Sequence, residues 1–114
     1  MANSFGTGES LVKHDGLGAD LIRFSKGEGV QNHTHPGHHI LFVLSGNGYV
    51  VYAGKGHKLE PGICYFVQGN VDHAIKATED LVMIAVGNEH YQVDSEQRMT
   101  PVAYREETPE ELRV

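Results

Sequence analysis

Four histidines occupy seven consecutive positions of this chain, immediately before a run of residues typical of a buried β-strand. The segment reads HTHPGHH from His33 to His39 and continues as ILFVLSG to Gly46. Branched and aromatic residues dominate the second part and favour a strand. Imidazoles that lead into an interior strand carry a large desolvation cost unless something satisfies their ring nitrogens. The chain is therefore limited to folds that gather histidines where β-strands meet.

The remaining sequence reads as a succession of short strands and tight turns. Strands are predicted at residues 20–25, 39–44, 49–53, 63–67, 73–77 and 81–86, with another short strand inside residues 54–62. The residues SGNG at positions 45–48 predict a hairpin turn, and 14 glycines fit many such turns. No segment repeats apolar residues with the 3.6-residue period of a helix. The sequence predicts an all-β sandwich or small barrel.

Length and composition bound the possible classes of protein. The 114 residues suit one domain, with a barrel core at about residues 20–93, an arm at 1–19 and an acidic tail at 94–114. Within the arm, Leu11 and Val12 predict a short strand. The net charge of −6 disfavours binding to nucleic acid or to an anionic membrane. Cys64 has no second cysteine to pair with, and no signal peptide or spanning segment is apparent, so we expect a cytoplasmic protein.

The spacing of the first two histidines suits a metal site. Residues i and i+2 of a strand share one face, so His33 and His35 lie roughly 6.5 to 7 Å apart along it. Two imidazoles at that spacing can converge on one ion at about 2.0 to 2.1 Å each. Pro36 keeps His35 extended, because the residue before a proline avoids the helical region.

Alternation selects two further ligands from the other histidines. His38 and His39 are adjacent and point to opposite faces, and His39 shares its face with the apolar Leu41 and Val43. His73 likewise shares a face with the apolar Ile75 and Ala77. The sequence therefore predicts that His33, His35, His39 and His73 point inward and hold one metal ion, while His38 points outward.

Other interpretations of the histidines remain open. His14, His57 and His90 stand in glycine-rich or polar surroundings and are taken as ordinary surface or satisfied core histidines. For the inward-facing set, a closed structural zinc site is an alternative, although such sites are usually richer in cysteine. An open site that binds a ligand or catalyses a reaction is preferred.

The motifs resemble those of the cupins, which are small jelly-roll barrels. The first cupin motif, G-x5-H-x-H-x3,4-E-x6-G, is matched by His33 to Gly46, with His39 in place of the glutamate. The second, G-x5-P-x-G-x2-H-x3-N, is matched from Gly62 to His73 and beyond. The resemblance covers roughly residues 20–87. It implies a double-stranded β-helix barrel, Gly46 and Gly62 as turn glycines, and the metal-ligand set His33, His35, His39 and His73, as in four-histidine bacterial cupins.

Three positions depart from the second motif. Gln68 replaces the proline, Asn70 replaces the second glycine, and Ala77 replaces the final asparagine. Asn70 is a mild change, because asparagine tolerates the left-handed conformation that glycine supplies. Gln68 is a candidate substrate contact, as are Tyr52 and Tyr65, and no catalytic acid or base is assigned.

The resemblance and the ligand set together suggest a metal-dependent enzyme. Four neutral imidazoles leave the charge of a divalent ion uncompensated, which favours anionic or chelating oxygen ligands. Imidazole accepts Mn, Fe, Co, Ni, Cu and Zn, so the metal is not resolved. We expect oxidation by dioxygen or carbon–carbon cleavage of a small oxygenated substrate. The alternatives are an isomerase or lyase acting on a sugar acid or keto acid, and a module that binds a small ligand without turnover. Cupin-like barrels commonly pair through terminal strands, so a homodimer is expected, with the arm as one contact.

Overall fold

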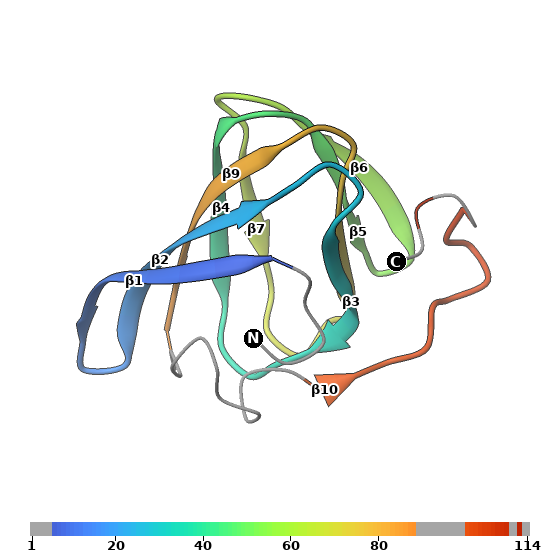
Figure 1. Cartoon of the computed structure of the whole chain (residues 1–114). Helices are drawn as coiled ribbons and strands as arrows, with labels where there is room; N and C mark the ends of the chain where they lie inside the picture. Colours follow the sequence, from blue (N-terminus) through green and yellow to red (C-terminus); the bar gives the residue numbers. More distant parts are fainter. Residues whose placement is uncertain (1–5, 89–99, 110–111, 113–114) are drawn as a thin grey trace.

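The computed structural model describes residues 6–88, 100–109 and 112, and it shows an all-β protein (Figure 1). The described strands are β1 (Thr7–His14), β2 (Leu17–Phe24), β3 (Gly29–Thr34), β4 (His39–Ser45), β5 (Gly48–Tyr52), β6 (Lys55–Leu59), β7 (Cys64–Val67), β8 (His73–Ala77), β9 (Leu81–Gly87) and β10 (Thr100–Pro101). Each predicted strand is present, with bounds that differ by a few residues.

The strands form two antiparallel sheets that face each other as a jelly-roll barrel. The first sheet has the order β1-β2-β9-β4-β7, and the second has the order β10-β3-β8-β5-β6. The chain passes repeatedly from one sheet to the other (Figure 1). Among the described strands it does so between β2 and β3, β3 and β4, β4 and β5, β6 and β7, β7 and β8, and β8 and β9. This winding brings the start of β4 and the start of β8 to the same end of the barrel as the end of β3.

The core fills the space between the two sheets with alternate side chains of each strand. From the first sheet come Leu41, Val43, Met83 and Ala85, and from the second come Val30, Val50, Ile75 and Ala77. Each large aliphatic side chain buried in this way stabilises the fold by about 1.5 to 3 kcal/mol. The pattern of alternation seen in the sequence is thus the inward face of each sheet.

The turns contain the special residues that the motifs predict. Gly46 and Gly62 both have positive φ angles, of 89° and 90°. A Cβ on Gly46 would also overlap the backbone carbonyl of Asp80, so this position excludes side chains for two independent reasons. Asn70 has a φ of 63°, which confirms that it supplies the left-handed turn in place of glycine.

The N-terminal part differs from the expected arm. Residues 7–14 form a full strand that pairs with β2 from Thr7↔Arg23 to His14↔Leu17, with an irregularity between Ser10 and Val12. The strand is exposed along nearly its whole length, so its sequence lacks the one-sided apolar pattern that reveals other strands. Residues 1–5 of the predicted arm lie outside the described part.

The C-terminal part adds a short strand to the second sheet. β10 pairs with β3 at Thr100↔Thr34 and Pro101↔His33, and the segment continues along the outside of the sheet to residue 109 (Figure 1). Residues 94–99, 110–111 and 113–114 of the predicted tail lie outside the described part. Among the residues that the structure describes, no helix has the length and apolar character needed to cross a membrane.

Candidate metal centre

The end of β3, the start of β4 and the start of β8 converge on one cluster of buried histidines. One ring nitrogen from each of His33, His35 and His73 lies within 4.8 Å of the other two, and His39 is not part of this close set. The ring of His39 stands nearly perpendicular to that of His35, with centroids 4.4 Å apart. All four imidazoles are buried and line a single cavity.

A bulge in β3 places two of these rings opposite each other. Gly29↔Lys76 and Val30↔Ile75 are regular partners, but the register shifts before His33↔His73. A β-bulge of this kind redirects the side chains that follow it. As a result the rings of His33 and His73 have centroids only 4.3 Å apart.

Backbone carbonyls fix which nitrogen of each ring faces the cavity. The Nδ1 atom of His33 lies 2.7 Å from the carbonyl oxygen of Gln31, and that of His73 lies 2.8 Å from the carbonyl of Val71. For His35 the corresponding distance, to the carbonyl of Pro36, is 3.2 Å. A carbonyl oxygen only accepts, so each Nδ1 must carry the proton and donate it. Each neutral ring therefore presents an unprotonated Nε2.

Two of these unprotonated nitrogens face each other closely. The Nε2 atoms of His35 and His73 are 3.1 Å apart. Two lone pairs at that distance repel unless a proton or a metal cation lies between the rings. Two imidazoles bound to one ion at about 2.1 Å, with an angle of roughly 95° between them, would have the same separation. The donor atoms present thus fit a divalent transition metal.

Burial argues against a proton in that place. It lowers the pKa of His73 from 6.5 to about 4, and the repulsion from His35 adds to the effect. The pKa of His33 is lowered well below its usual value, first by burial and then by the nearby His73. Both rings are therefore neutral at physiological pH, which is the form that binds metals.

The space for the His39 ring depends on a glycine of the neighbouring strand. His39 pairs with Gly87 of β9. A Cβ at position 87 would lie 2.7 Å from Nε2 of His39 and 2.7 Å from the carbonyl oxygen of His38. Only glycine leaves room for this imidazole, and the sequence pattern did not point to this role.

The remaining wall of the cavity is aliphatic. The cavity has a volume of about 50 Å³. This suits an ion with a few small ligands, because one water molecule needs a cavity volume of roughly 10 to 15 Å³. A substrate larger than a few atoms must extend from the cavity toward the open end. The aliphatic wall consists of Ile22, Val30, Leu41, Val67, Ile75 and Ala85.

The other histidines lie away from this cavity. His38 is exposed, as alternation predicts, and its ring packs near that of Phe66 with centroids 5.6 Å apart. His14 is exposed on the hairpin of β1 and β2. His57 is exposed but its ring lies 5.4 Å from that of Tyr65. His90 is outside the described residues.

The predicted substrate contacts occupy different positions. Gln68 is exposed and follows Val67, whose side chain lines the cavity. Tyr52 is the pairing partner of His73, and its ring meets that of Tyr65 edge to face at 6.0 Å. Both tyrosines are partly buried against the core. Burial, and to a lesser degree Tyr52, raises the pKa of Tyr65, so its phenol stays protonated.

Two residues beside the cluster were missed from the sequence. Asn32 and Asp72 immediately precede His33 and His73 and are themselves buried. Their position next to predicted ligands, together with alternation, places them behind the cluster on the outer face of the sheet. Polar residues at buried strand positions are the signal that would have identified them.

Comparison with known proteins gives one family and several relatives. Residues 20–87 match the family model described as Cupin domain. The chain is 30% identical over 83 residues to L-ectoine synthase of Vibrio campbellii, which is 68% of this chain and 65% of the synthase. The chain therefore spans about 65% of the length of that relative.

Solved structures share the fold. KdgF from Halomonas sp. is 22% identical with a TM-score of 0.71, over 75% of this chain and 79% of that protein. An RmlC-like cupin from Shewanella frigidimarina is 25% identical with a TM-score of 0.71, over 75% and 77%. Salicylate 1,2-dioxygenase from Pseudoaminobacter salicylatoxidans, in a complex with gentisate, is 20% identical with a TM-score of 0.69, over 73% of this chain and 25% of that one.

Proposed function

The chain belongs to the cupin family, and from that premise we propose that it is a metal-dependent enzyme acting on a small oxygenated organic molecule. In this proposal one divalent transition-metal ion is held by His33, His35, His39 and His73. The observation that carries it is the close set of His33, His35 and His73, whose Nδ1 atoms are held by backbone carbonyls and two of whose Nε2 atoms are 3.1 Å apart. His39 joins the set because its ring lines the same cavity.

The chain's own residues would prepare the site for this chemistry. A bound divalent ion supplies Lewis acidity, and four neutral imidazoles leave its charge uncompensated, which favours an anionic or chelating substrate. The carbonyls of Gln31 and Val71 hold two ligand rings in the required direction and tautomer. The aliphatic wall keeps water away from the reacting atoms, which strengthens electrostatic interactions inside the cavity.

We favour oxidation by dioxygen, or dioxygen-dependent carbon–carbon cleavage, as the reaction class. Dioxygen is apolar and small, and it suits an aliphatic cavity of about 50 Å³ beside a metal. One protein that shares this fold is a salicylate 1,2-dioxygenase. At 20% identity this similarity concerns the fold alone. The proposed reaction class is therefore supported by the size and lining of the cavity.

A second candidate is isomerase or lyase chemistry on a sugar acid or keto acid. The relative that is 30% identical is a synthase by name, L-ectoine synthase, rather than an oxygenase. In this case the ion would stabilise negative charge on substrate oxygens. The same barrel could also bind a small ligand without turnover, and the experiment below separates the three possibilities.

Substrate contacts are proposed for Tyr52, Tyr65 and Gln68. Tyr52 lies beside His73 across the β5–β8 pair. The ring of Tyr65 lies next to that of Tyr52, with centroids 6.0 Å apart. The two phenol groups can donate hydrogen bonds to oxygens of a substrate that extends beyond the cavity. Gln68, exposed at the end of β7, would contact the part of the substrate nearest to solvent.

The test is aerobic and anaerobic turnover by protein loaded separately with Fe²⁺, Mn²⁺, Ni²⁺, Cu²⁺ or Zn²⁺. A panel of small hydroxy acids, keto acids and dihydroxybenzoates is offered while an oxygen electrode and NMR follow dioxygen and product. Oxygen uptake that His73→Gln abolishes supports the oxygenase. Anaerobic conversion supports the isomerase or lyase, and thermal shifts without any product would replace the enzyme with a binding module.

The homodimer is proposed on the outer face of the first sheet. Large apolar side chains that are 39 to 56% exposed gather there, namely Leu17, Ile40, Phe42, Leu44 and Phe66. They expose roughly 450 Å² at about 200 Å² per fully exposed side chain, which is the size of the largest apolar patch on many monomers, a kind of patch that is often functional. It is about half of what each partner contributes to a standard interface.

The second sheet shows what a covered outer face looks like in this protein. Val51 and Ala74 are buried although alternation turns them away from the core. The C-terminal segment reaches this outer face, where Leu112 lies close to Gly56, the pairing partner of Val51. No described part of the chain covers the first sheet in the same way, so a second copy is the proposed occupant. Light scattering should give a dimer for the wild-type protein and a monomer for Phe66→Asp; a wild-type monomer would contradict the proposal. Cytoplasmic location stays a prediction from the sequence.

A further inference from the structure

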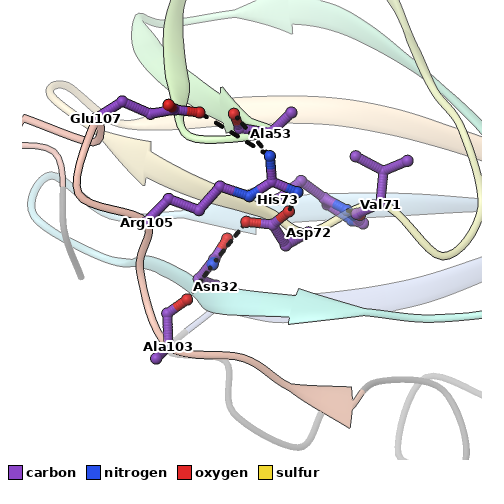
Figure 2. Close-up of polar contacts among 8 residues, drawn as sticks. All are labelled: Asn32, Ala53, Val71, Asp72, His73, Ala103, Arg105 and Glu107. Atoms are coloured by element: carbon purple, nitrogen blue, oxygen red, sulfur yellow. Dashed lines mark hydrogen bonds and ion pairs between the residues drawn. The ribbon is translucent and has the colours of Figure 1, made fainter.

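A buried polar network lies directly behind the histidine cluster. Asn32 and Asp72 are 3% and 4% exposed, and each immediately precedes a candidate ligand, His33 or His73. Because side chains alternate along a strand, the two polar groups face outward where the two imidazoles face inward. Figure 2 shows Asp72 between Asn32 and the side chain of Arg105, which comes from the C-terminal segment.

The network crosses the strand pair that carries the two ligands. Nδ2 of Asn32 donates to Oδ2 of Asp72 at 3.2 Å, so the bond joins β3 to the residue before β8. The same amide group donates to the carbonyl oxygen of Ala103 at 3.1 Å. This connection lies where the β3–β8 register shifts to oppose His33 and His73, a place where regular ladder bonds are interrupted.

Arg105 supplies the positive charge for the buried carboxylate. Its Nη2 atom forms an ion pair with Oδ1 of Asp72, whose side chain is 5% exposed, while the arginine itself is 47% exposed. Its Nη1 atom donates to the carbonyl oxygen of Ala53 at 3.4 Å and lies 3.9 Å from Glu107 (Figure 2). A buried carboxylate left without its partner is strongly destabilising, so removal of Arg105 would force Asp72, and with it the start of β8, to move.

The main chain attaches the same segment to β3. The amide of Val102 donates to the carbonyl oxygen of Asn32 at 2.9 Å, next to the β10–β3 pair. The segment is therefore bound to both residues that precede ligands, at Asn32 through the backbone and at Asp72 through Arg105. A shift of the segment would be transmitted to both strands of the cluster.

We propose that Arg105 is a positioning residue of the metal centre, which acts through Asp72 and Asn32 to hold His73 and His33 at ligand distance. The docked C-terminal segment of residues 100–108 and the metal site then stabilise each other. The inference rests on the proposed metal site and goes beyond it, because it assigns a role in metal affinity to a residue outside the cavity. Coupling of this kind is reciprocal, so metal binding must also strengthen docking of the segment.

The test compares metal affinity in variants of the full-length protein. Wild type, Arg105→Ala, Arg105→Lys and the control Arg23→Ala, an exposed arginine of the first sheet, are titrated with Zn²⁺ against a chelator and with Co²⁺ by visible absorption. We expect Arg105→Ala to weaken Zn²⁺ binding by about 10-fold or more, as outer contacts of metal ligands commonly do. Its Co²⁺ spectrum should also shift, Arg105→Lys should restore part of the affinity, and Arg23→Ala should match wild type.

A measurement on wild type keeps the inference testable if Arg105→Ala does not fold. Hydrogen exchange at the Val102 amide should slow when Zn²⁺ is added. Equal Zn²⁺ affinity and equal Co²⁺ spectra in wild type and Arg105→Ala would overturn the inference but not the metal site. An exchange rate of the Val102 amide that does not change when Zn²⁺ is added would do the same. Wild type that binds neither ion would overturn the metal site itself and the inference with it.

Discussion

Acid should destabilise the metal-free protein because its buried histidines resist protonation. The pKa of His73 is about 4 in the folded protein, against 6.5 for an ordinary histidine. Between these two values the unfolded chain binds a proton that the folded chain does not, so the free energy of unfolding falls as the pH falls. A difference of about 2.5 pKa units corresponds to roughly 3 kcal/mol, lost progressively from pH 6.5 to 4. His33, whose pKa is also lowered, adds to this loss.

The assay is urea denaturation of the metal-free protein at a series of pH values. The free energy of unfolding should be nearly constant above pH 7 and should fall through the window below 6.5. His73→Gln removes one of the resisting groups, so its curve should be flatter over this window, whereas His14→Ala, which alters an exposed histidine, should keep the wild-type slope. Parallel curves for wild type and His73→Gln between pH 6.5 and 4 would refute the reasoning, because the imidazole would then not be the group that resists protonation.

Substitutions at three positions test the backbone around the site and its turns. Gly87→Ala places a methyl group 2.7 Å from Nε2 of His39, so the Zn²⁺ affinity should fall about 10-fold, while circular dichroism should show a folded protein. An unchanged Zn²⁺ affinity would show that the His39 ring is not a ligand. In Gly46→Ala the new methyl group would overlap the carbonyl of Asp80, and the backbone would keep a positive φ, so the free energy of unfolding should fall by about 2 kcal/mol or more. A loss below about 0.5 kcal/mol would contradict this geometry. Asn70→Ala should cost about 1 kcal/mol and Asn70→Gly almost nothing in urea denaturation, because the φ of 63° suits glycine; equal costs would be inconsistent with that backbone.

The interior of the barrel could be predicted from the sequence because it repeats one physical rule. Alternating apolar residues mark the inward face of β4, β8 and β9, and the same parity assigned His39 and His73 to the interior and His38 to the surface. The left-handed turn at Asn70 was expected because asparagine stands where the second cupin motif has a glycine, and asparagine tolerates that conformation. These predictions depend on local geometry, which a single sequence contains.

The parts that were missed depend on pairing between distant segments. In β1 only a short strand at Leu11 and Val12 was predicted, because nearly the whole strand is exposed and has no one-sided apolar pattern. Hydrogen bonds to β2 extend it from Thr7 to His14. The polar network joins Asn32, Asp72 and Arg105, which are separated by 40 and 33 positions in the chain. The need for glycine at position 87 likewise appears only when β9 lies beside His39.

Metal content tests the central claim most directly. Untagged wild-type protein and the His33→Ala and His38→Ala variants are analysed by plasma mass spectrometry and then titrated with Zn²⁺ by calorimetry after chelation. The four-histidine centre predicts one equivalent of a transition metal, or one tight Zn²⁺ site, in wild type and His38→Ala, and loss of that binding in His33→Ala. Wild-type protein that contains no metal and takes up none on titration would contradict the account.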